Sequence, residues 1–320
     1  MSGISALGTT FNLPNYHGQL LALSPEDTPF TTAIGGLTGG ESTKSKTFEW
    51  QTYDLRAAAT DRQRLEGADA PTMDERVRAN VSNVVEIHQE KVSVSYSKQA
   101  ATQQYANGNY GSDNPVNDEL GFQLQAALKA KKRDIEKTFI QGVKVTPTDN
   151  TTAYATGGLN AAIATNVVAK SGTPTLTASD VIGLLQTVWE AGGIQESETA
   201  TLIVAGGLKR WLTKLFVTDK GYIEQTRDVG GVHVQTIETD FGRLNVMLNR
   251  YQTASTLTVC SLEECAPVFL EIPGKGFLFA EPLAKVGAAD NVQLYGEVGL
   301  KWGNELKHGK ITGLLTTAPA

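Results

Sequence analysis

Polar and apolar positions are distributed unevenly along the 320-residue chain, and the first hundred residues contain no long amphipathic helix. Turn-forming runs such as Ser24-Pro25-Glu26-Asp27-Thr28-Pro29 and Gly35-Gly36 dominate there. A segment of this composition buries too little apolar surface to offset its ordering entropy. It nevertheless keeps residues that a disordered tail lacks: Phe48, Trp50, Tyr53, Ile87, Val92, Val94 and Tyr96. We therefore expect other subunits to supply the missing surface, as in a self-assembling structural protein.

A long hairpin is predicted within this region. Residues 46–55 alternate between polar and apolar, with Phe48 and Trp50 on one face, and residues 83–97 form the expected return strand. The apolar phase switches between the two halves of that return strand. The switch predicts a bulge or bend at residues 88–91.

The segment between these strands, residues 54–78, interleaves charges of both signs. Loops of this length are uncommon inside compact domains, and an isolated two-stranded ribbon is barely stable in water. Two interpretations follow: an arm that lies across a neighbouring subunit and pairs charges there, or a solvated surface loop. The candidate subunit-interface residues are Trp50, Arg56, Arg62, Arg64, Glu66, Asp69, Arg76 and Arg78.

One long amphipathic helix is predicted from Pro115 to Gln141. Asn114-Pro115 favours its start and Gly142 its end, and apolar residues recur between them at three- and four-residue steps. At 1.5 Å per residue the helix is roughly 40 Å long, which is longer than the average helix of a globular domain. We interpret it as a spine helix. Its run of cations is interpreted as a solvated stripe, with a nucleic-acid contact as the alternative: Lys129, Lys131, Lys132 and Arg133.

The second half of the chain has the pattern of a compact α/β fold. Residues 143–175 are interpreted as loop with short pieces of structure. Thr177-Ala178-Ser179-Asp180 resembles a capping box that opens a helix extending to Trp189. A buried strand at 201–205 precedes a second helix at 206–216. The remaining predicted strands are 232–239 and 244–248, joined as a hairpin, and then 257–262, 268–272, 277–280, 292–300 and 310–315.

Composition narrows the function classes. A net charge of −6 argues against a protein whose main task is to grip nucleic acid, and 40% hydrophobic residues permit a real core. Residues 1–6 do not resemble a secretory signal, and no apolar window is long enough to span a membrane. Cys260 and Cys265 are the only cysteines and are expected to be reduced packing residues.

No catalytic constellation is present in the sequence. The four histidines are far apart, and none has a second ligand at metal-binding spacing. Gly206-Gly207 lies between a strand and a helix but lacks the lysine–hydroxyl pair of a phosphate loop, so it is interpreted as a tight turn. We therefore expect no catalytic residue, no cofactor, no metal and no enzymatic activity.

The order of these parts, together with several short motifs, resembles one protein family across nearly the whole chain. The motifs are Leu23-Ser24-Pro25-Glu26-Asp27-Thr28-Pro29-Phe30, Thr239-Asp240-Phe241-Gly242 with Asn249-Arg250, Glu281-Pro282-Leu283-Ala284-Lys285-Val286-Gly287 with Glu297, Asn304-Glu305, and His308-Gly309-Lys310-Ile311. On these residues the chain resembles the major capsid proteins of tailed bacteriophages, with the Hong Kong 97-like fold.

The resemblance implies an α+β fold with four parts. They are an N-terminal arm (1–45), a β-hairpin extended loop (46–100), a peripheral domain (101–176 and 271–320) with a spine helix at about 115–141, and an α/β axial domain (177–270). Some such capsids join subunits by isopeptide bonds, for which Lys44, Lys46 and Asn304 are the hypothetical partners.

The resemblance also implies the partners. The chain would self-assemble into pentamers and hexamers of an icosahedral virion shell in the host cytoplasm, enclosing DNA on the inner face without sequence-specific binding and without a membrane. A scaffolding protein, a portal and a decoration protein are the further expected partners. Scaffolding is expected to be a separate protein, because no charged helical domain follows Met1. The alternatives are an encapsulin-like nanocompartment shell and a soluble enzyme.

Overall fold

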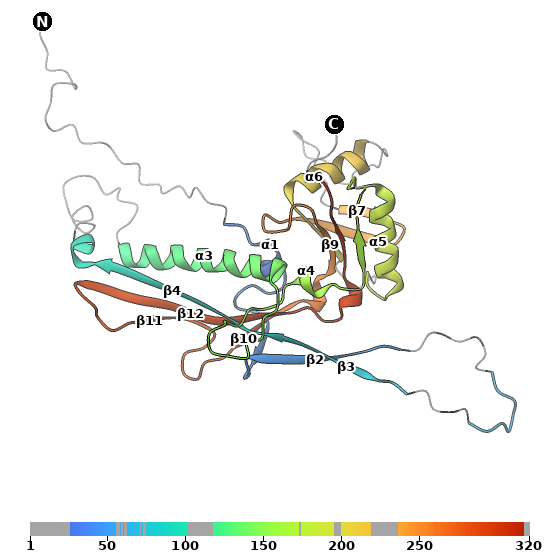
Figure 1. Ribbon diagram of the computed structural model, residues 1–320, viewed down its shortest axis with the longest axis horizontal. Helices are drawn as coiled ribbons and strands as arrows, with labels where there is room; N and C mark the ends of the chain where they lie inside the picture. The colour runs from blue at the N-terminus through green and yellow to red at the C-terminus, as the bar shows by residue number, and fades with distance from the viewer. Residues whose placement is uncertain are drawn as a thin grey trace, which may run out of the picture. The chain divides into compact units, whose positions relative to one another are not determined.

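The computed structural model describes residues 26–55, 58, 60, 63–70, 72, 75–100, 118–172, 174–194, 200–218 and 236–316 (Figure 1). Two compact units divide the chain. Unit 1 comprises Met1–Asp27, Gln89–Lys131 and Phe279–Tyr295, and unit 2 comprises Thr28–His88, Lys132–Leu278 and Gly296–Ala320. Four elements contribute residues to both units: β4 (Glu86–Ser95), α3 (Glu119–Gln141), β11 (Leu278–Pro282) and β12 (Ala289–Lys301).

Unit 1 combines part of a sheet with the first half of α3. Strand β12 pairs with β4 on one side and with β11 (Leu278–Pro282) on the other. In β4, Val92 and Val94 are buried while Ser93 between them is exposed, as expected for a half-buried strand. These valines pack with Leu294 of β12 and Ala127 of α3.

Part of unit 2 is built on the second half of α3. The short helix α1 (Pro29–Ala33) buries Phe30 completely, together with Phe139 of α3. Strand β1 (Glu41–Thr43) pairs in parallel with β10 (Ala266–Leu270), which pairs antiparallel with β12. The segment from Thr28 onward, which the sequence assigned to an N-terminal arm, therefore packs into this core.

A six-stranded sheet forms the other part of unit 2. Its order is β5 (Val167–Ala169), β13 (Gly309–Thr312), β9 (Leu257–Ser261), β6 (Ala200–Val204), β8 (Gly242–Leu248) and β7 (Thr236–Thr239). Helices α5 (Ala178–Glu190) and α6 (Gly206–Thr213) share one hydrophobic cluster with β6 and β9. The short helix α4 (Leu159–Ala162) precedes β5.

Both faces of this sheet are buried. In β6, Leu202 and Val204 belong to the cluster with α5 and α6, whereas Ile203 belongs to the cluster that contains Phe139 of α3. Burial on two faces explains why β6 is apolar at successive positions and does not alternate. Strands β5 and β13 join the sheet from outside the predicted axial range, residues 177–270.

The hairpin is present, but its return strand was predicted wrongly. Strand β2 (Thr47–Tyr53) pairs with β3 (Arg78–Val84), in a register from Thr47 opposite Val84 to Tyr53 opposite Arg78. Figure 1 shows this ribbon leading into the long loop. The predicted return strand, residues 83–97, is mostly β4, which pairs with β12 instead.

The phase switch lies earlier than the predicted bend at residues 88–91. Val84 and Val85 are 0% and 1% exposed, and two consecutive inward residues cannot share one face of a regular strand. The break between β3 and β4 is therefore at Val85, and from His88 onward the buried phase is constant through Val94. The sequence concealed β3 because most of its residues are polar.

Most other predicted elements are confirmed. Helix α3 ends at Gln141 before Gly142, and its predicted start at Pro115 lies outside the described residues. Two apolar positions of the predicted stripes are exposed instead, Leu128 at 40% and Trp189 at 52%. The predicted hairpin near residue 240 is present as β7 and β8, and its positions 232–235 lie outside the described residues.

Candidate assembly site

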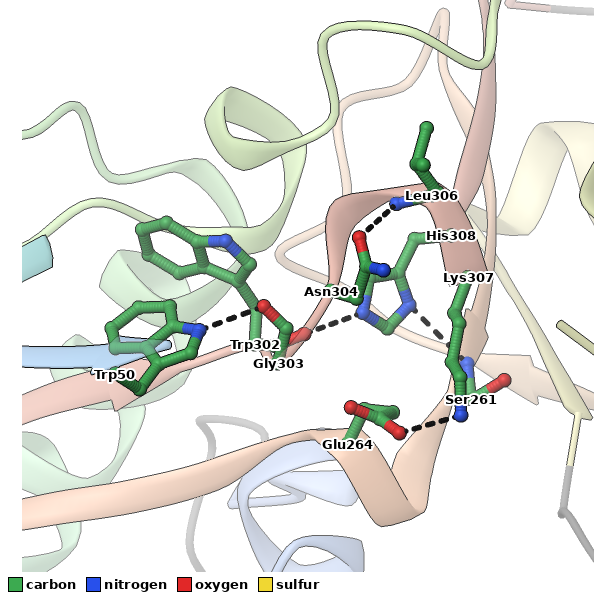
Figure 2. Close-up of polar contacts among 9 residues, drawn as sticks. All are labelled: Trp50, Ser261, Glu264, Trp302, Gly303, Asn304, Leu306, Lys307 and His308. Carbon is green, nitrogen blue, oxygen red and sulfur yellow. Dashed lines mark hydrogen bonds and ion pairs between the residues drawn. The ribbon is translucent and has the colours of Figure 1, made fainter. Parts of the chain in front are cut away.

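The hairpin is bound to the end of β12 through aromatic side chains (Figure 2). The Trp50 indole Nε1–H donates to the carbonyl oxygen of Gly303 at 2.8 Å, and the Trp50 ring meets Trp302 edge-on with centroids 5.0 Å apart. Phe48 stacks on Trp50 at 5.9 Å. A Cβ at Gly299 would come within 2.7 Å of the Phe48 ring, so only glycine lets the ribbon approach β12 this closely. We call this contact the hairpin base.

The turn that carries the Gly303 carbonyl is fixed on its other side. Gly303 has φ +62°, and a Cβ there would lie 2.1 Å from Oε2 of Glu264. Glu264 in turn pairs with Lys307 at 2.7 Å. The Asn304 side-chain oxygen accepts from the N–H of Leu306 at 3.1 Å and caps the 3₁₀ helix η4 (Glu305–Lys307).

His308 connects this turn to the six-stranded sheet. Its imidazole is fully buried, with Nε2 2.7 Å from the Trp302 carbonyl oxygen, while Nδ1 accepts from the Ser261 N–H at 3.3 Å. The neutral tautomer with its proton on Nε2 satisfies both contacts. The adjacent carbonyls of Trp302 and Gly303 therefore join His308 to Trp50, as Figure 2 shows.

Asn83 joins the second strand of the hairpin to the loop at Thr156–Gly157 and to β12. It is fully buried in β3, and its Nδ2 donates to Thr156 Oγ1 at 3.0 Å and to the Leu300 carbonyl at 2.7 Å. Its Oδ1 accepts from the Gly157 N–H at 2.9 Å. A buried amide with donors and acceptor all engaged fixes strand position without an unsatisfied polar group.

Glu86, at the start of β4, lies beside this amide network. Burial raises the pKa of its carboxyl, the Thr156 N–H that donates to it opposes the rise, and the charge of Asp134 adds to it. His88 Nε2 is 3.9 Å from the same carboxylate.

The loop beyond the hairpin base holds the predicted interface residues. Arg64, Glu66, Asp69, Arg76 and Arg78 are exposed, and Arg56 and Arg62 lie outside the described residues. Trp50 differs from these, because its indole is bound within its own chain. The assignment of all eight residues to a subunit interface stays a prediction.

Tyr53 of the flanking strand was named from the sequence, but the apolar side chains of the loop itself were overlooked: Leu55, Leu65 and Val77. Tyr53 is 65% exposed, Leu55 70%, Leu65 86% and Val77 73%. Large apolar residues placed singly in a charged loop were the available signal, and the charges around them obscured it.

A second junction unites two motifs that are distant in sequence. The fully buried Glu136 carboxylate of α3 accepts from the Phe30 N–H at 2.9 Å, from the Thr31 N–H at 2.6 Å and from the Thr31 hydroxyl, and also from the Asn249 side-chain amide. Helix α1 has no side-chain cap of its own, so Glu136 supplies the negative charge at its N-terminus. We call this contact the Glu136 junction.

The described residues contain no cluster of His, Cys, Asp and Glu side chains that could hold a metal ion. Cys260 and Cys265 are free and buried, and burial together with the charge of Glu263 raises the pKa of the Cys260 thiol to about 12. Such a thiol is protonated and unreactive at neutral pH. Across the described residues, every helix is too short or too polar to cross a membrane.

Comparison with known protein families identifies the family to which the chain belongs. The family model of the SU10 major capsid protein matches residues 3–315. The chain belongs to this family. The major capsid protein of Escherichia phage Phieco32 is 33% identical over 120 residues, which cover 38% of this chain and 30% of that protein's length.

Solved structures show that this SU10-family chain has the Hong Kong 97-like fold, as predicted. The cyanophage A-1(L) capsid subunit matches with a TM-score of 0.66 at 14% identity, covering 97% of this chain and 99% of that one. The SrpI encapsulin of Synechococcus elongatus PCC 7942 matches with a TM-score of 0.61 at 10% identity, covering 100% of this chain and 99% of that one. The fold is thus shared by viral capsids and an encapsulin.

Proposed function

We propose that this chain is the major capsid protein of a tailed bacteriophage and assembles into the icosahedral head shell that encloses viral DNA. The observation that carries the proposal is the match of the capsid family model to residues 3–315. In this role the chain is a structural component of the virion and not an enzyme. Copies of the chain form the pentamers and hexamers of which the shell is built.

The hairpin loop supports an interlocking role. Four large apolar side chains, Tyr53, Leu55, Leu65 and Val77, are each at least 65% exposed near charged neighbours. Covering these side chains with a neighbouring subunit would remove their apolar area from water, which is worth about 25 cal/mol per Å². Apolar side chains supply affinity, while charged ones such as Arg64 and Glu66 set register and specificity. We propose that the apolar and charged side chains of this loop cover part of the surface of an adjacent copy of the chain.

Replacement of the loop tests this role. Tyr53 and Arg78 are directly paired, so a two-residue Asn-Gly turn can replace residues 54–77 without changing the ribbon. We expect the variant to fold, because the hairpin base is untouched, but to remain as subunits or capsomers in negative-stain micrographs.

Two variants that keep the loop length separate the contributions of apolar and charged side chains to shell assembly. Replacing Leu55, Leu65 and Val77 by serine should reduce shell yield at every salt concentration. Replacing Arg64 and Arg76 by glutamine should reduce it mainly at low salt, where charge pairing is strongest. Intact shells from the chain with the two-residue turn would overturn the interlocking role.

The remaining partners follow from the capsid role. We infer a separate scaffolding protein, a portal, and a decoration protein as further partners, and assembly in the host cytoplasm. A nanocompartment shell is the competing function, since an encapsulin has the same fold. The capsid family match favours the viral capsid over the nanocompartment. The ratio of absorbance at 260 nm to that at 280 nm, measured on particles from infected cells, distinguishes a DNA cargo from a protein cargo.

A further inference from the structure

The cations of α3 differ between its two halves. In unit 1, Lys129 pairs with Glu26 at 2.8 Å, and Lys131 pairs with Glu90 at 3.6 Å. In unit 2, the next three cations of the same helix form no ion pair with any carboxylate of the described chain: Lys132, Arg133 and Lys137. The sequence left open whether this run is solvated or contacts nucleic acid.

A turn that follows β8 of the six-stranded sheet is hydrogen-bonded to α3 beside these cations. Asn249, which follows β8, is held at the Glu136 junction and accepts from the Tyr251 N–H at 2.8 Å. The Tyr251 phenol oxygen accepts from Arg133 Nε at 2.9 Å, and the Gln141 amide donates to the Tyr251 carbonyl. Arg250, between the two anchored residues, is exposed, and it already has an interaction within the chain.

We call Lys132, Arg133, Lys137, Arg250 and Tyr251 the α3 basic surface. The Glu136 carboxylate lies on the same helix, but it is fully buried and engaged by four donors. Asp134 is exposed, and its charge acts on Glu86 of β4. Lys132, Arg133 and Lys137 are thus three cations without an ion pair in the described chain, two of them half-buried and Lys137 exposed, in a protein whose net charge is −6.

The chemistry of this surface suits phosphodiesters. Arginine and lysine side chains bind phosphate oxygens, and guanidinium groups held by a second contact lose less conformational entropy on binding. Because Tyr251 already accepts from Arg133, its own O–H remains able to donate to a further oxygen. Contacts of this kind engage the backbone of a nucleic acid and read no base sequence.

We propose that the α3 basic surface binds the phosphate backbone of double-stranded DNA without sequence preference. The proposal rests on the proposed capsid function for the identity of the ligand, the packaged genome. Binding by unassembled chain is measured independently of shell closure, so the two proposals fail separately.

The test is fluorescence anisotropy with a labelled 30-base-pair duplex of random sequence and full-length unassembled chain in low salt. The charge variant carries K132Q, R133Q, K137Q and R250Q. A matched control removes four exposed cations elsewhere through K44Q, K91Q, R243Q and K275Q, which gives the same net charge.

We expect the charge variant to bind at least tenfold more weakly than the control. Its plot of log affinity against log salt should be shallower by up to about 3.6, since each phosphate contact contributes about 0.9 to the slope. Y251F removes a hydroxyl but no charge, so it should weaken binding a fewfold and leave the slope unchanged.

Three results would overturn the proposal: no binding by the wild-type chain, equal losses in both quadruple variants, or unchanged DNA affinity with a loss of shell assembly. The last result would identify a protein–protein interface. If the quadruple variant fails to fold, the exposed-site single variants K137Q and R250Q replace it, with K91Q and K275Q as controls.

Discussion

At the scale of single residues, the hairpin base depends on polar atoms whose partners lie far along the chain. Trp50 donates to Gly303, and Asn83 donates to Thr156 and Leu300. A buried carbonyl that loses its donor costs more than the net value of the hydrogen bond, because its desolvation is no longer compensated. Single substitutions here should therefore act on stability.

Trp50→Phe removes the indole N–H but keeps an aromatic ring beside Trp302. We expect the free energy of unfolding to fall by about 1 to 2 kcal/mol, because the Gly303 carbonyl loses its donor. Thermal or urea unfolding of the unassembled chain measures the change.

Trp189→Phe is the matched control, since Trp189 is 52% exposed and contacts Phe241 through its ring alone. It should change stability by less than about 0.5 kcal/mol. Equal losses in both variants would mean that the Gly303 hydrogen bond contributes nothing specific.

At the scale of elements, α5 illustrates how local sequence sets a helix start. The Thr177 hydroxyl accepts from the Asp180 N–H, and the Asp180 carboxylate accepts from the Thr177 N–H at 2.9 Å and pairs with Lys170 at 2.7 Å. Burial raises the pKa of Asp180, but the hydrogen bonds from Lys170 and Thr177 outweigh it, so its pKa is lowered from the ordinary value of 3.8.

A carboxyl whose pKa is lower in the folded state stabilises the fold above its unfolded pKa, and this contribution is lost as the pH falls through the lowered value. Asp180→Asn should therefore cost about 1 kcal/mol at neutral pH, and the cost should diminish below about pH 4. Urea unfolding at several pH values measures it. Asp240→Asn, in the exposed β7–β8 turn, is the control, and a pH-independent cost for Asp180→Asn would contradict the assignment.

Elements with local signals were predictable, and elements defined by distant partners were not. The capping box of α5, the apolar stripe of α3 and the β7–β8 hairpin are set by nearby residues, and all are confirmed apart from Leu128 of the stripe, which is exposed. Strand β3 is mostly polar and begins with three exposed residues, and it is held by β2 and by the loop around Thr156. The pairing of β4 with β12 likewise depends on a strand two hundred residues away, which periodicity cannot reveal.

The candidate site divides in the same way. Charge pattern located the hairpin loop, since Arg64, Glu66 and Asp69 are exposed there. Neither the Glu136 junction nor the role of His308 could be predicted, because each joins residues that are more than forty positions apart. The motifs at Thr28-Pro29-Phe30 and Asn249-Arg250 carried the family resemblance, yet only the structure brings them to one carboxylate.

At the scale of the whole molecule, stability is unequal along the chain. Strands β6 and β9 are buried on both faces of their sheet, whereas residues 63–70 of the hairpin loop are all exposed. Regions with few buried contacts open at low free-energy cost. The loop should therefore gain order only when a neighbouring copy covers it.

Hydrogen exchange compares the two states. Amides of residues 63–70 should exchange rapidly in unassembled chain and at least tenfold more slowly in shells, while amides of β6 and β9 stay protected in both. Peptides from the exposed β7–β8 turn serve as an internal reference. Slow exchange of the loop in the unassembled chain would show that its order comes from its own chain.

The two neighbouring peptide carbonyls at Trp302 and Gly303 have a mechanical consequence. One binds the indole at the foot of the ribbon, and the other binds the imidazole that also receives the N–H at the end of β9. If the ribbon binds an adjacent copy, a force on the ribbon is transmitted through one residue, Gly303, and then through His308 to β9 and β13. Tension between copies is then spread over a whole sheet, which resists stretching through many backbone hydrogen bonds in parallel.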